Sequence, residues 1–407
     1  MHRLGDDRRR ELFDYWFSRG AGDTRVLTRA TRGGPLRVWV PMLERYVWGC
    51  ETPKLATARY VFSGHKYQQL IEALPIEQVA LAGIRPAHLR YARERGIAAQ
   101  SLFEGRSALA RNFPEPRRPE QLDRAFDALV KALSGEPGRF LVLQTDSNPI
   151  NRLLLFAARE AGMCTVCIQH GIFQSGSPPH IVDGWTADYM LVYDRYQRAV
   201  FADKGMAPER LPVLGFHERP AAEPPPPPGP ARRVCVMGQP WANFHSDLEA
   251  RYLAILRSVF GDLRAAGLDV VFKPHPREKG QHYLGEFGEC FEGSMSEALA
   301  RFEVCISITS TALLEATLAG RVAIQIHDEV FDADRFDEAG YAHTIDAADL
   351  TGLSALCLEA APVDNPDLEL LSPPELAARF VEVLGKLDPN APPHRKPASR
   401  APAIRVG

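Results

Sequence analysis

The feature that most constrains the fold is a repeated alternation of short apolar runs with helical segments. Apolar runs such as 139–146 and 269–276 alternate with amphipathic segments that end at a glycine, as at Gly162 and Gly267. Strands that alternate with helices of about 10–15 residues form parallel sheets covered by helices on both faces. We therefore predict an α/β chain built from doubly wound parallel sheets.

The alternation occurs in two sets, and a proline-rich segment separates them. This segment contains five consecutive prolines at 224–228, which fit neither a helix nor a sheet interior. A chain of 407 residues is also long for a single core. Two Rossmann-like domains facing each other across a cleft form the GT-B architecture, which we predict here. The predicted parts are an N-terminal acceptor domain at 1–217, a linker at 218–233, a C-terminal nucleotide-donor domain at 234–388, and a disordered basic tail at 389–407.

The individual elements follow from the same pattern. In the first set we predict strands at 35–41, 76–83, 96–103, 139–146, 163–171, 187–193 and 211–216, and helices at 65–74, 85–96, 119–135, 149–162 and 194–205. In the second set we predict strands at 232–240, 269–276, 303–309 and 321–327, and helices at 246–267, 294–302, 310–320 and 375–387. In sheets of this kind, ligands bind at the carboxyl ends of the strands.

Composition and motif searches exclude several classes of function. A net charge of −3 gives no basis for nucleic-acid binding, and the sequence has no apolar run long enough to span a membrane. Seven scattered cysteines suit a reducing cytoplasm, and we interpret Cys164 and Cys167 as buried thiols on opposite faces of one strand. No HxxxH, HExxH, P-loop, GxGxxG or GxSxG motif occurs. We therefore expect no metal and no cofactor.

Two strand ends in the second set carry residues that suit a phosphate. The apolar run 270–272 leads into Lys273, His275 and Pro276, and the run 304–306 leads through Ser307 to Thr309, Ser310 and Thr311 at the start of a helix. The first N–H groups of a helix lack partners, and the helix dipole is positive there, so this arrangement binds anions. Ordinary turn and helix-capping roles are the alternatives.

Three further residues are candidates for substrate contact or catalysis. Glu315 lies one helical turn after Thr311, within reach of a ribose or a base, although an exposed helical glutamate is the alternative. His170 ends a strand and precedes a glycine, and histidine suits the role of a general base. Asp146 ends the previous strand and is the second candidate base; capping the next helix is its alternative role. A phosphate contact remains the other role for His170.

The sequences QHG (169–171), FKPHP (272–276) and SITSTALLEA (307–316) together resemble bacterial cell-surface polysaccharide transferases of GT-B type. This group includes capsule Kdo-transferases, sialyl- and polysialyltransferases and, more distantly, CDP-glycerol glycerophosphotransferases. The resemblance covers about 139–326. It implies that His275, Ser310 and Thr311 hold the phosphate of a cytidine-nucleotide donor and that His170 is the base. The acidic base motif of the sialyltransferases has no convincing counterpart before the linker.

The resemblance implies an inverting, metal-independent transfer of a sugar from a nucleotide-sugar donor, expected to be CMP-linked, to a glycan or lipid-linked acceptor. The alternatives are a CDP-glycerol-type phosphotransferase, a UDP-sugar epimerase or hydrolase of the same fold, and a non-catalytic scaffold. We expect a cytoplasmic protein. A lipid-linked acceptor would place it at the inner face of the cytoplasmic membrane, where the arginines at 8–10 beside Phe13, Trp16 and Phe17 would help; solvated charge is their alternative role.

Overall fold

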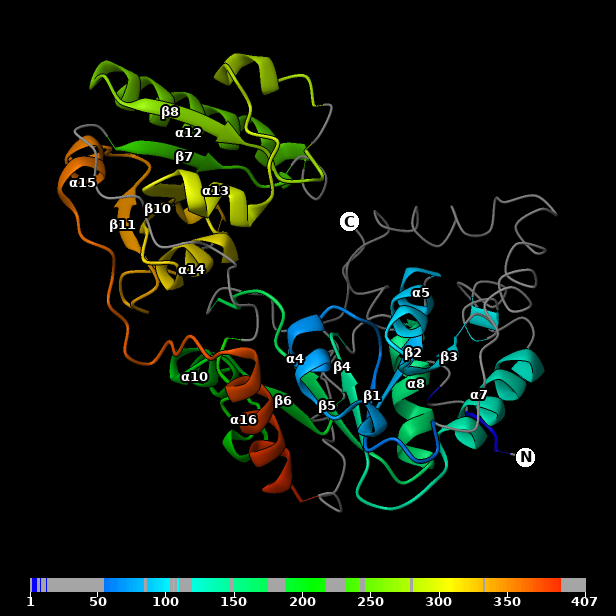
Figure 1. Ribbon diagram of the computed structural model, residues 1–407. Helices are drawn as coiled ribbons and strands as arrows, with labels where there is room; N and C mark the ends of the chain where they lie inside the picture. Colours follow the sequence, from blue (N-terminus) through cyan, green and yellow to red (C-terminus); the bar gives the residue numbers. More distant parts are fainter. Residues whose placement is uncertain are drawn as a thin grey trace.

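A computed structural model describes residues 2–5, 8, 12, 55–83, 86–102, 105, 108–109, 119–145, 149–174, 187–216, 232–241, 246–278, 281–331 and 334–388. Several predictions lie outside these residues, namely the strand at 35–41, the candidate base Asp146, nearly all of the linker, and the tail. The described residues form two parallel sheets, each with helices on both faces (Figure 1).

The first sheet has six parallel strands in the order β3-β2-β1-β4-β5-β6. Side chains alternate between two apolar layers, so Cys164 faces one layer and Cys167 the other, as their spacing predicts. The elements of this domain are β1 (Tyr60–Phe62), α4 (Gln68–Ala73), β2 (Val79–Gly83), α5 (Pro86–Glu94), β3 (Ala98–Ser101), α7 (Pro119–Leu133), β4 (Phe140–Leu143), α8 (Pro149–Glu160), β5 (Cys164–Ile168), β6 (Tyr189–Leu191) and α10 (Arg195–Asp203), with 3₁₀ turns at Ile76–Gln78 and Pro208–Arg210.

The second sheet has five parallel strands in the order β11-β10-β9-β7-β8. One apolar layer joins the sheet to α12 and α15, and the other joins it to α13 and α14. The elements are β7 (Arg233–Met237), α12 (Ser246–Ala265), β8 (Asp269–Lys273), α13 (Met295–Arg301), β9 (Val304–Ser307), α14 (Thr311–Leu318), β10 (Val322–His327), β11 (His343–Asp346), α15 (Leu353–Glu359) and α16 (Pro373–Gly385), with 3₁₀ turns at Leu284–Phe287 and Glu329–Phe331.

The last helix, α16, returns to the first sheet. It packs against α4, and Phe380 meets Tyr60 and Phe62 at ring-centroid distances of 5.4 and 6.1 Å (Figure 1). Our predicted boundaries group this helix with the C-terminal domain, at 234–388, but its apolar face is buried in the N-terminal one. The described chain therefore crosses between the domains a second time, after α15.

Most predicted elements are confirmed, and the differences have local causes. The sequence pattern does not predict the strand β1, which has only three residues, too few to show alternation. It does not predict the strand β11 or the helix α15 either. Residues 211–216, predicted as a strand, contribute only an isolated bridge between Val213 and Val192.

In both sheets the strand order reverses next to the first strand. The order changes direction between β1 and β4 in the first sheet and between β7 and β9 in the second. Such switch points leave a crevice at the carboxyl ends of the strands, where ligands bind in open α/β sheets. The loops after β1, β7 and β9 are therefore the places to look for a site.

Candidate active site

The turn after β8 is held by one buried carboxylate. The backbone N–H of His275 donates to Glu278 Oε2 at 2.7 Å, and Glu278 Oε1 accepts from the hydroxyls of Tyr252 and Tyr283 at 2.9 and 2.8 Å. The Glu278 side chain is fully buried. Burial raises the pKa of this carboxyl, and these hydrogen bonds act in the opposite direction. The turn that presents His275 is thus fixed from inside the domain.

The imidazole of His275 is set up as a neutral hydrogen-bond donor. Its Nδ1 accepts from the backbone N–H of Arg277 at 3.1 Å, so the neutral ring carries its proton on Nε2. Burial lowers the pKa of His275, and the positive charges of Arg277 and Lys273 lower it further. A neutral ring with an Nε2–H can donate to a phosphate oxygen.

The helix α14 supplies a second anion-binding element. Ser310 is its N-cap, and the Ser310 hydroxyl accepts from the backbone N–H of Ala312 at 3.2 Å. Thr311 occupies the first helical position, and Glu315 lies one turn later, partly exposed. The cap places Ser310 and Thr311 at the positive end of the α14 dipole, where an anion is favoured.

A chain of hydrogen bonds joins these two elements across three strand ends. The backbone N–H of Thr309 donates to Gln239 Oε1 at 3.0 Å, and the backbone N–H of Gln239 donates to the Tyr252 hydroxyl at 2.9 Å. Tyr252 in turn donates to Glu278, which holds His275. The loops after β7, β8 and β9 therefore form one connected unit around the switch point of the second sheet.

The side chain of Lys273, unlike that of His275, makes contacts with the segment before α13. Its ammonium donates to the carbonyl of Gly293 and lies 5.5 Å from the ring centroid of Phe291. Pro276 is exposed. The contacts of Lys273 thus tie β8 to the segment before α13, and its contact with a phosphate stays a prediction.

In the first domain, the backbone around His170 is held on both sides while its side chain is exposed. The buried Gln169 donates to the carbonyl of Gly171 at 2.9 Å and accepts from the backbone N–H of Tyr193 at 3.0 Å. The Gly171 N–H donates to the Tyr193 hydroxyl at 3.1 Å. Gly171 has φ +85°, a conformation that glycine adopts without strain.

The ring of His170 contacts a residue that sequence reasoning did not select. Lys66 lies in the loop after β1, and its Nζ hydrogen-bonds to His170 Nδ1. The loop after β1 follows the strand that borders the switch point of the first sheet. The other candidate base, Asp146, lies outside the described residues, so its role stays a prediction.

The two strand-end regions meet at the domain junction. The backbone N–H of Ile172 donates to the Thr311 hydroxyl at 3.3 Å, which joins the His170 loop to the start of α14. Nearby, the buried Tyr341 donates to Asp194 Oδ2 at 2.6 Å. Burial raises the pKa of Asp194, and the bonds from Gln197 and Tyr341 oppose this. The start of α14 and the loop after His170 thus meet at the domain junction, while Asp146 lies outside the described residues.

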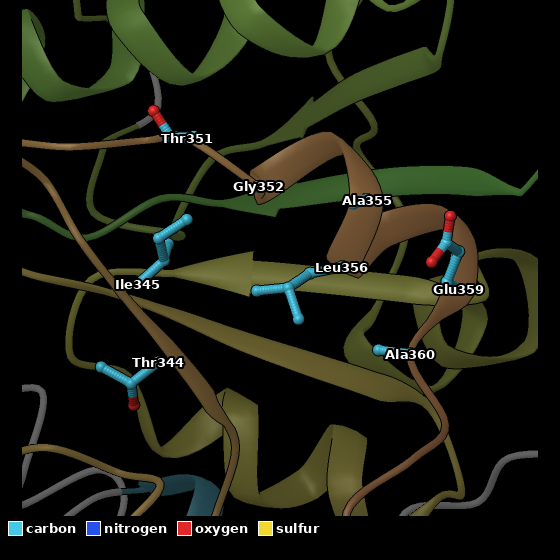
Figure 2. A pocket seen from close by; sticks show the side chains of 8 residues that line it. All are labelled: Thr344, Ile345, Thr351, Gly352, Ala355, Leu356, Glu359 and Ala360. Carbon is cyan, nitrogen blue, oxygen red and sulfur yellow. The ribbon is translucent and has the colours of Figure 1, made fainter.

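One groove lies apart from this junction. It is open, has a volume of about 520 Å³ and runs along β11 and α15, where Ile345, Leu356 and Ala360 are among the residues that line it (Figure 2).

Within the described ranges, no group of three or more His, Cys, Asp or Glu side chains is placed to hold a metal ion. Across the same part of the chain, no helix has the length and apolar character needed to span a bilayer.

Four residues of the junction had no signal strong enough to select them from sequence. Gln239 and Glu278 follow strand ends, but a single glutamine or glutamate after a strand is common. Lys66 lies within the helix predicted at 65–74, but α4 begins only at Gln68, so Lys66 belongs to the loop before it. Tyr252 lies within α12 among apolar residues, where a tyrosine fits an ordinary core position. Its role in the site is shown only by the hydrogen bonds of its hydroxyl to Gln239 and Glu278.

Comparison with known proteins identifies the architecture. No protein-family model matches the chain, and no curated protein matches it by sequence. Among solved structures, Anabaena HepE in complex with UDP and glucose has a TM-score of 0.52 at 12% identity, covering 81% of this chain and 100% of HepE. The Methanocaldococcus jannaschii UDP-GlcNAc 2-epimerase in complex with UDP-GlcNAc and UDP also has a TM-score of 0.52 at 12% identity, covering 80% of this chain and 98% of the epimerase.

A third similar structure, the UDP-GlcNAc 2-epimerase of Neisseria meningitidis bound to UDP-GlcNAc, has a TM-score of 0.51 at 10% identity and covers 81% of this chain and 99% of the epimerase. Identities this low establish the fold alone. The chain has the two-domain, Rossmann-like GT-B fold. The predicted fold class is confirmed.

Proposed function

We propose that this chain is a glycosyltransferase that uses a nucleotide-activated sugar donor. The main support is the geometry at the start of α14, where the Ser310 cap and the Thr311 hydroxyl adjoin the His170 loop of the other domain. A hydrogen-bonded chain links this helix start to His275. Two coupled anion-binding elements at a sheet switch point suit the phosphate of a nucleotide.

In the proposed reaction, an acceptor hydroxyl attacks the anomeric carbon of the donor from the face opposite the nucleotide. The new C–O bond forms as the bond to the phosphate oxygen breaks, and the electron pair of that bond stays on the phosphate. The His275 Nε2–H and the positive end of the α14 dipole stabilise the charge that grows there. No metal ion is needed for this role. A basic group takes the proton of the acceptor hydroxyl, and Asp146 and His170 are the two candidates.

The proposed donor is a CMP-linked sugar, because the QHG, FKPHP and SITSTALLEA segments resemble transferases that use cytidine nucleotides. The acceptor is proposed to be a cell-surface glycan or a lipid-linked precursor at the inner face of the cytoplasmic membrane. In the described part of the N-terminus, Arg8 pairs with Glu160 at 3.3 Å and lies 5.8 Å from the Phe156 ring centroid. That arginine is therefore held by the protein surface, so a membrane contact would depend on its neighbours.

A second candidate function is epimerisation or hydrolysis of a UDP-sugar without an acceptor. It is favoured by the likeness to the two UDP-GlcNAc 2-epimerases, which extends over 80% and 81% of this chain. An epimerase turns over its nucleotide-sugar alone, whereas a transferase also needs an acceptor. The two candidates therefore differ in one measurable requirement.

The test is a thermal-shift screen of the purified protein with CMP, CDP, UDP and GDP, followed by turnover assays with the matching nucleotide-sugars. A ligand that binds only the folded state raises the melting temperature. We expect CMP to give the largest shift, and turnover to need an acceptor. A shift with UDP alone, with acceptor-independent turnover of a UDP-sugar, would support the second candidate. No shift with any nucleotide would end both.

A further inference from the structure

The contact between Lys66 and His170 determines what the histidine can do. The two residues are 104 positions apart in sequence, and the parallel order of β1, β4 and β5 brings the loops after β1 and β5 to the same sheet edge. There the Lys66 Nζ hydrogen-bonds to Nδ1 of His170. Lysine carries only donors when it is charged. Nδ1 of His170 is therefore the acceptor in this bond.

This bond fixes which nitrogen of His170 carries the proton. A neutral imidazole has one donor and one acceptor nitrogen, so an accepting Nδ1 leaves the proton on Nε2. A doubly protonated ring would have no acceptor for the lysine and would repel its ammonium. A general base needs a ring nitrogen that is free of a proton and faces the acceptor hydroxyl. With Nδ1 engaged by Lys66, His170 has no such nitrogen.

The position of the pair relates it to the helix start in the other domain. Gly171 follows His170 directly, and a Cβ at Gly171 would lie 3.7 Å from the Thr311 hydroxyl oxygen. The next backbone N–H, that of Ile172, donates to the same oxygen. The loop that presents His170 therefore adjoins the first residue of α14. An ammonium and an N–H donor there add positive potential to the region proposed for a phosphate.

We infer that His170 is an Nε2–H donor which, together with the Lys66 ammonium, binds a phosphate group of a reactant, and that it does not remove the proton of the acceptor. This rests on the proposed function and changes its assignment of roles. The proton of the acceptor hydroxyl then goes to a group other than His170. The phosphate belongs either to the nucleotide donor or to a phosphorylated, lipid-linked acceptor, and both offer the same oxygen chemistry.

The first test measures the position of the proton directly and does not depend on turnover. Protein with ¹⁵N-labelled histidine is examined by NMR, and the His170 signals are assigned from their loss in the His170→Gln variant. We expect a protonated Nε2 and an unprotonated Nδ1 in the wild type, and a weaker preference for this tautomer in Lys66→Met. A proton on Nδ1 in the wild type, with Nε2 free, would overturn the inference.

The second test compares four variants. The side-chain amide of glutamine can replace the Nε2–H donor of histidine but cannot act as a base at neutral pH. His170→Gln should therefore keep a turnover rate within about tenfold of wild type, whereas His170→Ala should lose about 100-fold or more. Equal inactivity of both variants would show that His170 is the base and overturn the inference. Lys66→Met should weaken phosphate binding about tenfold or more, and Lys66→Arg should restore most of it.

The affinity measurements also identify the source of the phosphate. If Lys66→Met raises the Kd for CMP but leaves that for cytidine unchanged, the pair binds the donor phosphate. If only the KM of a phosphorylated acceptor rises, the pair binds the acceptor. If neither changes, the phosphate role is overturned. The control is Lys386→Met, which removes a 72% exposed lysine at the C-cap of α16. If the wild type binds no nucleotide but the His170 proton is found on Nε2, the proposed function is overturned and the proton assignment stands.

Discussion

The two halves of the candidate site orient their histidines in the same way by different means. In the C-terminal domain, Nδ1 of His275 accepts from a backbone N–H two residues away. In the N-terminal domain, Nδ1 of His170 accepts from the side chain of Lys66, 104 residues away. Each arrangement leaves the proton on Nε2. A local turn builds the first half, and the tertiary fold builds the second.

The two halves also differ in their support. His275 is backed by the fully buried Glu278 and its two tyrosine partners, all within one domain. His170 is exposed, and the loop after it touches the other domain at Thr311. The network around His275 is therefore expected to keep its geometry whether or not the domains move, because these hydrogen bonds do not cross the junction. The N-terminal half is expected to depend on the junction. Four substitutions test this difference.

The largest effect is expected for His275→Ala. It removes the Nε2–H that stabilises the leaving phosphate, and loss of one such donor lowers kcat by about 100-fold or more. The side chain is only partly buried, so the melting temperature should change little. Steady-state kinetics and a thermal melt on the same preparation measure both quantities. Full activity in this variant would contradict the proposed role of the C-terminal half.

Glu278→Ala should destabilise the C-terminal half, because it removes the buried carboxylate that holds the turn after β8. It leaves the hydroxyls of Tyr252 and Tyr283 and the N–H of His275 without their acceptor, and each buried unsatisfied group costs about 1–3 kcal/mol. We expect unfolding by urea to show a loss of about 3 kcal/mol, and any remaining folded protein to bind nucleotide weakly.

The control for Glu278→Ala is Glu286→Ala. It removes a 40% exposed carboxylate that pairs with Arg257, and surface ion pairs contribute about 0–1 kcal/mol. If both variants lose the same stability, the buried network does not support the turn after β8 as described.

Tyr341→Phe tests the junction through Asp194. The substitution leaves the buried Asp194 Oδ2 without its donor and should cost about 2 kcal/mol near pH 7. Burial raises the pKa of Asp194 and the Tyr341 hydroxyl lowers it, so the variant should raise the folded-state pKa further. A carboxyl with a raised folded pKa contributes stability below its unfolded pKa and loses it as pH rises through the folded pKa.

The stability deficit of Tyr341→Phe should therefore grow as pH rises from about 4 to 7. Urea unfolding at several pH values measures it. Tyr196→Phe is the comparison, because its hydroxyl also crosses the junction, to Asp334 at 2.8 Å, but ends on a partly exposed carboxylate. A deficit that does not vary with pH would show that the charge of Asp194 is not involved.

The smallest effect is expected for Thr311→Val. The valine has nearly the same shape and lacks the oxygen that accepts from Ile172, so the cost should be about 1 kcal/mol in stability. Nucleotide affinity should fall more than stability if this hydroxyl also contacts the donor. Thr311→Ser, which keeps the oxygen, should behave like the wild type. A stability loss in Thr311→Ser equal to that in Thr311→Val would assign the effect to the methyl group.

The parts of the site that follow from sequence are those made by neighbours in the chain. Two strand-end anion elements are predicted without a structure, one by Lys273, His275 and Pro276 after an apolar run, and the other by the hydroxyl residues 309–311 before an apolar helix. The structure places both at the carboxyl edge of the second sheet. It also shows that Lys273 bonds to Gly293, which its position beside His275 does not reveal.

The alternation of apolar runs and helices predicts that the chain folds into two doubly wound sheets, because strand and helix periodicities are local properties of the sequence. The three-dimensional structure was needed to show that α16 returns to the first sheet, that Gln239 and Tyr252 join the two anion elements, and that Lys66 contacts His170. Each of these contacts joins residues distant in sequence, and no local pattern marks the partner. The parallel topology brings such residues to one edge, and the side-chain hydrogen bonds made there determine what each residue can do.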